Sequence, residues 1–172
     1  CALDIINAKF LREVENGEIV FIENNELTSI KPFPPKKVRP CVFEYIYFAR
    51  PDSLINNKTA YEHRKNLGKE LANENNIDAD IVVPVPDSGN AAALGFSQKL
   101  KINFEHGLIR NHYVGRTFIE PSQKIRSLGV KLKLNANETT IKDKTIILID
   151  DSLVRGTTSH KIVKMLYDAG AK

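Results

Sequence analysis

The chain has 172 residues, of which 42% are hydrophobic, and it carries a formal net charge of +4. This length can bury a proper core, so we expect a globular α/β protein and not a disordered or fibrous chain. No apolar run is long enough to cross a bilayer, so we expect no membrane partner. Two cysteines are too few for a disulfide framework, which favours the cytoplasm. The basic residues are interleaved with acids, so we expect no nucleic-acid partner.

The first forty residues predict a β-hairpin followed by a linker. Glu18 to Ile22 and Glu26 to Ile30 are two strand-like runs separated by an asparagine turn. The stretch from Lys31 to Pro40 contains four prolines, which disfavour both a helix and a central strand. We therefore expect a domain junction near Pro40, with residues 1–40 in one part and 41–172 in the other.

The next two segments predict a strand and a helix. Cys41 to Phe48 is aromatic and β-branched, which is typical of a strand. The stretch from Ala60 to Asn73 predicts a helix with Leu67, Leu71 and Ala72 on one face.

A strand, a loop and a helix then occur in the same order twice. Ile81 to Val85 is followed by a helix from Ala91 to Leu100, and Lys144 to Asp150 by a helix from Thr157 to Ala169. With a short strand near residues 102–104, this pattern indicates a parallel sheet with right-handed crossovers. Gly170 is a suitable C-terminal cap for the last helix, and no further strand follows it in the sequence. We therefore expect an incomplete sheet and a piece of a longer protein.

The second of these loops has the form of a site for a phosphorylated sugar. Asp150 and Asp151 follow an apolar strand, where ligands bind in parallel sheets, and can accept hydrogen bonds from ribose hydroxyls or hold Mg²⁺. Residues 152–158 can surround a phosphate with backbone N–H and hydroxyl donors. Acids that simply end a strand, followed by an ordinary helix start, are the alternative, but the combination in this order favours a ribose 5-phosphate site.

Two further segments can contact an anionic substrate. The loop Asp87-Ser88-Gly89 precedes a helix and can present N–H groups to a pyrophosphate, or can simply connect a strand to a helix. The stretch from Gly107 to Arg126 predicts a long loop that can close over the substrate and bring Arg110 and Arg116 to a pyrophosphate, or can be an ordinary exposed basic loop.

These segments together resemble the glutamine phosphoribosylpyrophosphate (PRPP) amidotransferases, a branch of the type I phosphoribosyltransferase family. The signature is Asp150-Asp151-Ser152-Leu153-Val154-Arg155-Gly156-Thr157-Thr158, and the Asp87 and Arg110 segments precede it in the family's order. The resemblance implies an α/β fold with a Rossmann-like parallel-sheet phosphoribosyltransferase core over residues 41–172. It also implies that residues 1–40 are the β-rich tail of an N-terminal-nucleophile glutaminase domain.

The resemblance implies an enzyme that transfers glutamine-derived ammonia to C1 of PRPP, releases pyrophosphate and begins purine synthesis. The residues that it implies for PRPP binding are Asp87, Ser88, Gly89, Asp150, Asp151, Ser152, Val154, Arg155, Gly156, Thr157 and Thr158. It implies Mg²⁺ at Ser88, Asp150 and Asp151, and catalytic roles for Arg110, Tyr113, Arg116 and Asp151. Inhibition by purine nucleotides and a homo-oligomeric full-length protein are implied as well.

At three positions the family resemblance does not give a simple assignment. The family commonly has Lys-Asn-Arg where this chain has Arg110-Asn111-His112, so an anion contact at His112 is in doubt. Cys1 is not the glutaminase nucleophile, because the residues after it resemble the end of that domain and not its beginning. Cys41 matches a cysteine that ligates a [4Fe–4S] cluster in some relatives, and is otherwise a plain core cysteine.

Two other functions are compatible with a phosphoribosyl site. A base-salvage phosphoribosyltransferase would share residues 41–172 but would not explain the glutaminase-like segment from Cys1 to Ile30. A PRPP-sensing regulatory module would keep the pocket without catalysis, but no DNA-binding element is visible in the sequence.

Overall fold

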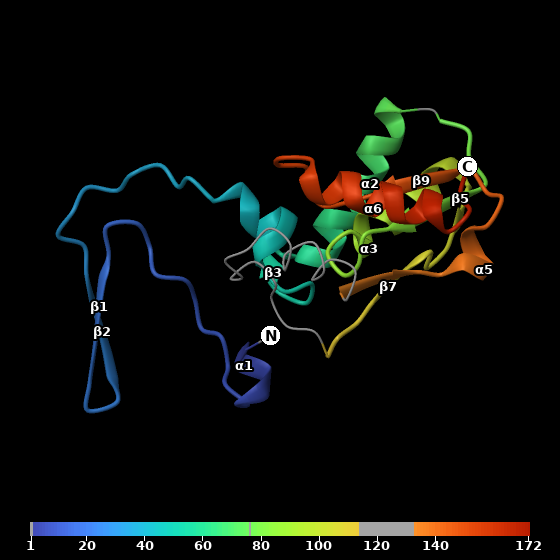
Figure 1. Ribbon diagram of the computed structural model, residues 1–172. Coiled ribbons are helices and arrows are strands. Elements are labelled where there is room, and N and C mark those ends of the chain that lie inside the picture. Colours follow the sequence, from blue (N-terminus) through green and yellow to red (C-terminus); the bar gives the residue numbers. More distant parts are fainter. Residues whose placement is uncertain (1, 76, 114–132) are drawn as a thin grey trace. The chain divides into compact units, whose positions relative to one another are not determined.

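The computed structural model describes residues 2–75, 77–113 and 133–172 (Figure 1). Contacts within the chain divide it into two compact units, Cys1–Val42 and Phe43–Lys172, and each is described by itself. No helix in these described ranges has the length and apolar character needed to span a membrane.

The first unit contains the predicted hairpin. A short helix, α1 (Ala2–Ile5), is followed by the antiparallel strands β1 (Ile19–Glu23) and β2 (Glu26–Ile30). Asn24 and Asn25 connect the strands with positive φ angles of 49° and 65°, as a two-residue hairpin turn requires. The prediction of a hairpin is therefore confirmed.

An ionic cluster at the base of the hairpin holds the Glu18 carboxylate. Arg12 donates to its two oxygens at 2.6 and 2.9 Å, the hydroxyl of Ser29 donates to it, and so does the backbone N–H of Glu15 at 2.6 Å. These bonds, with that of Arg12 the largest contribution, lower the pKa of Glu18 from 4.5 to about 2. Because the carboxylate must be ionised to accept them, their stabilising effect is lost as the pH falls from 4.5 towards 2.

Replacing Arg12 by glutamine tests this cluster. We expect the pKa of Glu18 to rise towards its ordinary value, because the charged donor is removed while the Ser29 and Glu15 donors remain. An NMR titration of the Glu18 side chain measures it directly. The control is Lys31→Gln, which removes a cation paired with Glu15 instead; equal shifts in both variants would contradict a specific role for Arg12.

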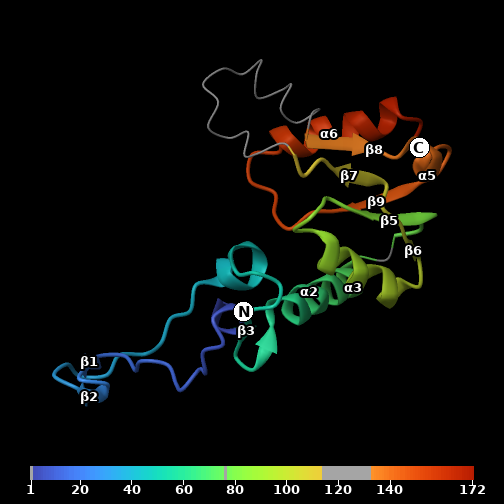
Figure 2. The same ribbon diagram turned by 90° about the horizontal axis from the view of Figure 1, so that it is seen from below.

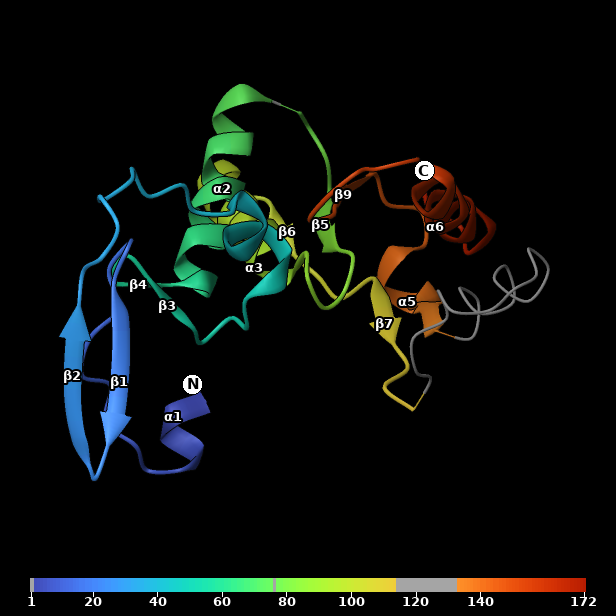
Figure 3. The same ribbon diagram turned by 90° about the vertical axis from the view of Figure 1, so that its left-hand side faces the viewer.

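The second unit is built on a three-stranded parallel sheet. Its order is β6 (Asn103–Phe104), β5 (Ile81–Pro84) and β9 (Ile146–Ile149), with Ile81 paired to Ile146 and Pro84 to Ile149. Helices α2 (Ala60–Glu74) and α3 (Asn90–Leu100) cover one face, and α6 (Thr157–Asp168) covers the other (Figure 2, Figure 3). The prediction of an α/β fold with a parallel sheet is confirmed.

Side chains that alternate along the strands divide the core into two layers. Val82, Ile147 and Ile149 pack with Ala72 of α2 and with Ala93 and Phe96 of α3. On the opposite face, a second cluster consists of Ile81, Val83, Val85, Leu108, Leu134, Ile141, Ile162 and Leu166. The central strand β5 is buried on both faces, which explains its continuous apolar sequence.

Helix α2 begins with a capping box and packs closely against α3. The Thr59 hydroxyl accepts from the Glu62 N–H at 3.1 Å, and the Glu62 carboxylate accepts from the Thr59 N–H at 3.0 Å. A Cβ at Gly68 would lie 1.9 Å from the carbonyl oxygen of Ala92, so only glycine permits this approach. The buried face of α2 consists of Ala60, Arg64, Gly68 and Ala72. Ala72 agrees with the prediction, but Leu67 and Leu71 were wrongly assigned to that face and are 49% and 38% exposed.

The prediction of a strand from Cys41 to Phe48 is wrong. Glu44–Phe48 forms a π-helical turn, η1, in which the Ala49 N–H donates to the Glu44 carbonyl at 3.4 Å. The side chain of Arg64 satisfies two carbonyls at this turn, a tertiary contact that overrides the strand preference of aromatic residues. Two short strands, β3 (Leu54–Ile55) and β4 (Lys58–Thr59), connect the turn to α2.

The predicted long loop from Gly107 begins with a strand. β7 (Leu108–Arg110) pairs in antiparallel fashion with β8 (Leu134–Ala136), because Leu108 and Leu134 are both buried in the core. The short helix α5 (Glu138–Ile141) follows. Residues 114–132 of the predicted loop lie outside the described residues.

Candidate functional site

The two loops that were predicted to bind substrate leave neighbouring strand ends. The Val85 N–H after β5 donates to the Ile149 carbonyl at the end of β9 at 2.8 Å. The chain then turns, and the Gly89 N–H donates back to the Val85 carbonyl at 3.0 Å. The structure thus brings Asp87, Ser88 and Gly89 to the same edge of the sheet as Asp150 and Asp151.

Gly89 is needed for the closeness of these loops. A Cβ at this position would lie 2.6 Å from the Ile149 carbonyl oxygen and 2.8 Å from that of Val85. Both are backbone atoms, which cannot move aside as a flexible side chain can. The glycine therefore lets the start of α3 pack directly on the last residue before Asp150.

The two acids differ in their surroundings. Burial raises the pKa of Asp150, and the neighbouring charge of Asp151 raises it further, although a bond from the Asp151 N–H to Asp150 Oδ1 at 2.9 Å opposes the change. Asp151 accepts a hydrogen bond from the Ser152 hydroxyl at 2.5 Å. Carboxylate oxygens such as those of Asp150 and Asp151 are the ligands that Mg²⁺ prefers, and Ser88 is half-buried in the loop at the same edge of the sheet. Within the described ranges, no three His, Cys, Asp or Glu side chains are grouped so that they could hold a metal ion.

The loop after the acids is exposed. Leu153 and Val154 are 74% and 88% exposed, and Ser152, Arg155, Thr157 and Thr158 are also on the surface. Gly156, with a φ of +70°, ends the loop at the N-terminus of the twelve-residue helix α6. The first N–H groups of this helix are oriented to bind an anion such as a phosphate.

The predicted loop cation Arg110 contacts the predicted pyrophosphate loop. Its Nη1 forms an ion pair with Asp87 Oδ2, while its Nε is buried and has no partner among the described residues. Tyr113 is fully exposed, and Arg116 lies outside the described residues. Arg110 is therefore the one predicted loop cation that the structure locates beside the strand ends.

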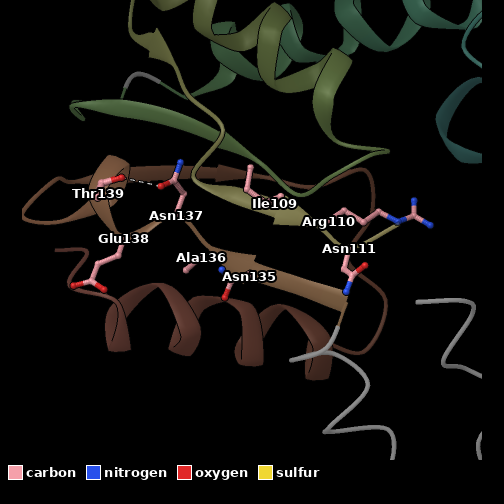
Figure 4. Close-up of a pocket in the computed structure, with 8 residues that line it drawn as sticks. All are labelled: Ile109, Arg110, Asn111, Asn135, Ala136, Asn137, Glu138 and Thr139. Carbon is pink, nitrogen blue, oxygen red and sulfur yellow. Dashed lines mark hydrogen bonds between the residues drawn. The ribbon is translucent and has the colours of Figure 1, made fainter. Parts of the chain in front are cut away.

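A hollow of about 450 Å³ lies beside the β7–β8 pair and was not indicated by the sequence. Its lining residues come from β7, β8 and the start of α5: Ile109, Arg110, Asn111, Asn135, Ala136, Asn137, Glu138 and Thr139 (Figure 4). The Thr139 hydroxyl donates to Asn137 Oδ1 at 3.0 Å, and Arg110 extends away from that end. Among the predicted site residues that the structure describes, Arg110 alone lines this hollow.

Sequence reasoning missed Arg64. This residue is 6% exposed, burial lowers the pKa of its guanidinium, and its Nε and Nη2 donate to the carbonyls of Tyr45 and Ala49. The sequence does contain a signal for a buried Arg64. It lies at a spacing of four in a row of small residues, Ala60, Gly68 and Ala72, which form the buried face of α2.

The similar proteins found by comparison share one enzyme name. The amidophosphoribosyltransferase of Rhizobium etli is 58% identical over 100% of the chain, and the chloroplastic amidophosphoribosyltransferase of Glycine max is 49% identical over 100%. The chain belongs to the amidophosphoribosyltransferase family. It spans 36% and 30% of the length of these two relatives, and no family model matches it.

A solved member of the amidophosphoribosyltransferase family has the same fold. The glutamine PRPP amidotransferase from B. subtilis complexed with ADP and GMP superposes with a TM-score of 0.89 and 48% identity. The match covers 100% of this chain and 38% of that protein. Within these relatives, the chain therefore corresponds to one continuous structural segment.

Substituting Gly89 by alanine tests the contact between the two loops. We expect a loss of stability of about 1–3 kcal/mol, because the added methyl group meets backbone oxygens. The Val85 N–H should also exchange faster with solvent, since the clash pushes the Ile149 carbonyl away. Thermal unfolding and amide hydrogen exchange measure the two effects.

The matched control is Leu153→Ala, a change at an exposed position of the facing loop, which should alter stability by no more than about 0.5 kcal/mol. If the glycine variant were as stable as this control, the close approach of the loops would be unimportant.

Proposed function

We propose that this chain is part of an amidophosphoribosyltransferase, which displaces pyrophosphate from C1 of PRPP with ammonia derived from glutamine. A C1–N bond forms and the C1–O bond to pyrophosphate breaks, giving 5-phosphoribosylamine in the first committed step of de novo purine synthesis. The observation that carries the proposal is the pairing of an Asp-Asp-Ser loop with an Asp-Ser-Gly loop at adjacent strand ends. The similarity over the whole chain supports the same function.

Each part of the site has a role in this reaction. Asp150 and Asp151 accept hydrogen bonds from the ribose hydroxyls, and residues 152–158 with the start of α6 bind the 5-phosphate. Asp87, Ser88, Gly89 and the start of α3 bind the pyrophosphate. Binding energy at the phosphate, remote from the reacting bond, positions C1 for attack by ammonia.

Cations offset the charge of the departing pyrophosphate in this proposal. Arg110 leaves its ion pair with Asp87 for the pyrophosphate, and Arg116 provides a second positive charge. Tyr113 is proposed as a further catalytic residue of the same segment. Ser88, Asp150 and Asp151 would hold Mg²⁺, which when bound would neutralise part of the negative charge on the leaving group. Cys41 is exposed, so its prediction as a core cysteine is wrong. The chain has two cysteines and a [4Fe–4S] cluster needs four, so these residues alone do not complete a cluster and we assign no step to one.

We also propose that residues 1–40 are the tail of a glutaminase domain and that residues 41–172 are the front of the phosphoribosyltransferase domain. No apolar residue in the described range 3–42 is buried, although apolar residues such as Phe21, Ile22 and Leu27 are common there. Such a segment needs further protein to cover it. The full-length protein would supply that protein and would be a cytoplasmic homo-oligomer, although the Glycine max relative is chloroplastic.

Purine nucleotides are proposed as inhibitors of the same enzyme. A nucleotide carries the 5-phosphate and the ribose that the Asp150 loop would recognise in PRPP, so it can compete for that part of the pocket. The B. subtilis relative was solved with ADP and GMP, which is consistent with this proposal.

Calorimetric titration of PRPP with Mg²⁺ tests the site, using a chain shown to be folded by circular dichroism. Saturable binding should be weakened at least about 100-fold by Asp150→Asn with Asp151→Asn, since each lost charged hydrogen bond contributes about 1.5–3 kcal/mol. AMP or GMP should compete with PRPP. Asp168→Asn, at an exposed position at the end of α6, is the control and should bind normally.

Absence of binding by the folded chain would contradict a self-sufficient pocket. In the full-length protein, glutamine-dependent formation of phosphoribosylamine distinguishes the proposed enzyme from a salvage enzyme, which would use purine bases or orotate as acceptors. A sensing module would bind PRPP and form neither product.

A further inference from the structure

Asp87 and Arg110 form an ion pair between the two segments that are proposed to bind pyrophosphate. Arg110 Nη1 contacts Asp87 Oδ2, and the two side chains are 33% and 48% exposed. Water and salt screen a pair with this exposure, so breaking it costs little free energy. A ligand that offers Arg110 a better acceptor can therefore displace the Asp87 carboxylate.

The ion pair leaves the Arg110 side chain incompletely satisfied. Its Nε is buried and has no hydrogen-bond partner within residues 2–75, 77–113 and 133–172. A guanidinium has five N–H donors in a planar fork, which two oxygens of one phosphate group can fill together. Asp87 contacts this fork through one oxygen and one nitrogen. A pyrophosphate beside the Asp87 loop could thus supply an acceptor that the carboxylate does not.

The backbone on both sides of the pair is held in place, so an exchange of partners needs only side-chain motion. Arg110 is the last residue of β7, and the Asn111 N–H after it donates to the Lys133 carbonyl at 2.8 Å. The Asp87 carbonyl accepts from the Asn90 N–H at 3.3 Å, where α3 begins. The Arg110 guanidinium can therefore move between two acceptors while its own strand stays fixed.

We propose that the Asp87 carboxylate is an internal competitor of the pyrophosphate group: it holds Arg110 in the absence of substrate, is displaced when PRPP binds, and pairs with Arg110 again as pyrophosphate leaves. This inference rests on the function proposed above. The Asp87 loop would bind pyrophosphate through its backbone N–H groups, since a carboxylate repels that anion. The pair then weakens PRPP binding by the fraction of molecules in which Arg110 is held, and favours release of the pyrophosphate product.

Calorimetric titration of the full-length protein with PRPP and Mg²⁺ tests this competition. At low ionic strength we expect Asp87→Asn to bind PRPP about 2- to 5-fold more tightly than the native protein, the range that an exposed ion pair allows. At about 1 M salt the two affinities should converge, because the pair is then screened in the native protein. Asp87→Ser also removes the charge, should tighten binding in the same way, and replaces the asparagine variant if that variant does not fold.

A double-mutant cycle separates competition for Arg110 from simple repulsion of the ligand. In an Arg110→Gln protein, the further change Asp87→Asn should leave the affinity for PRPP unchanged, because no cation remains to be released. If the carboxylate only repelled PRPP, Asp87→Asn would tighten binding by the same factor with and without Arg110. That result would overturn the proposal.

Two controls keep failure of this inference distinct from failure of the proposed function. Glu15→Gln removes a carboxylate paired with Lys31 in the first unit and should bind PRPP as the native protein does. Ribose 5-phosphate, which lacks the pyrophosphate, should bind equally to the native protein and to Asp87→Asn. Unchanged or weaker PRPP binding by the folded charge-free variants would overturn the inference alone, whereas a native protein that bound no PRPP would contradict the proposed function as well.

Discussion

The parallel pairing of β5 with β9 determines where the Asp87 loop and the Asp150 loop of the second unit can lie. Four residues of each strand are in register, from Ile81 opposite Ile146 to Pro84 opposite Ile149. Since both strands run in the same direction, their loops must emerge at the same edge of the sheet. The bond from the Val85 N–H to the Ile149 carbonyl extends this pairing by one residue, and Gly89 lets the next turn fold back on it. The two loops are therefore coupled through backbone atoms, which hold their position more firmly than side chains would.

The charged groups at this edge differ in their surroundings. Arg110 forms an ion pair with Asp87. Burial favours the neutral form of Asp150. In the proposed function, a substrate with several phosphate charges and two ribose hydroxyls would compete with Asp87 for Arg110 and would donate hydrogen bonds to Asp150 and Asp151.

Much of this unit could be predicted because local and tertiary signals agree. The apolar runs before Pro84 and Asp150 are strands, and the helices after them begin where glycine and hydroxyl residues indicated. The strand predicted at Cys41 to Phe48 failed because its conformation depends on Arg64, nineteen residues from Tyr45 along the chain. Leu67 and Leu71 failed for a related reason: α2 packs so closely on α3 that small residues, and not leucines, form the contact. The contact of Arg64 leaves no periodic pattern in the sequence, whereas the helix contact leaves small residues at a spacing of four, with Ala60, Gly68 and Ala72.

In the proposed function, the two acids and the exposed residues after them have different roles. Asp150 and Asp151 are partly buried at a rigid strand end, whereas Ser152 to Arg155 are exposed. Rigid acids can orient a ribose with little loss of entropy on binding, while exposed backbone donors remain accessible to an incoming phosphate. Because that phosphate is several bonds from C1, its binding energy can be used to align the sugar with the acids.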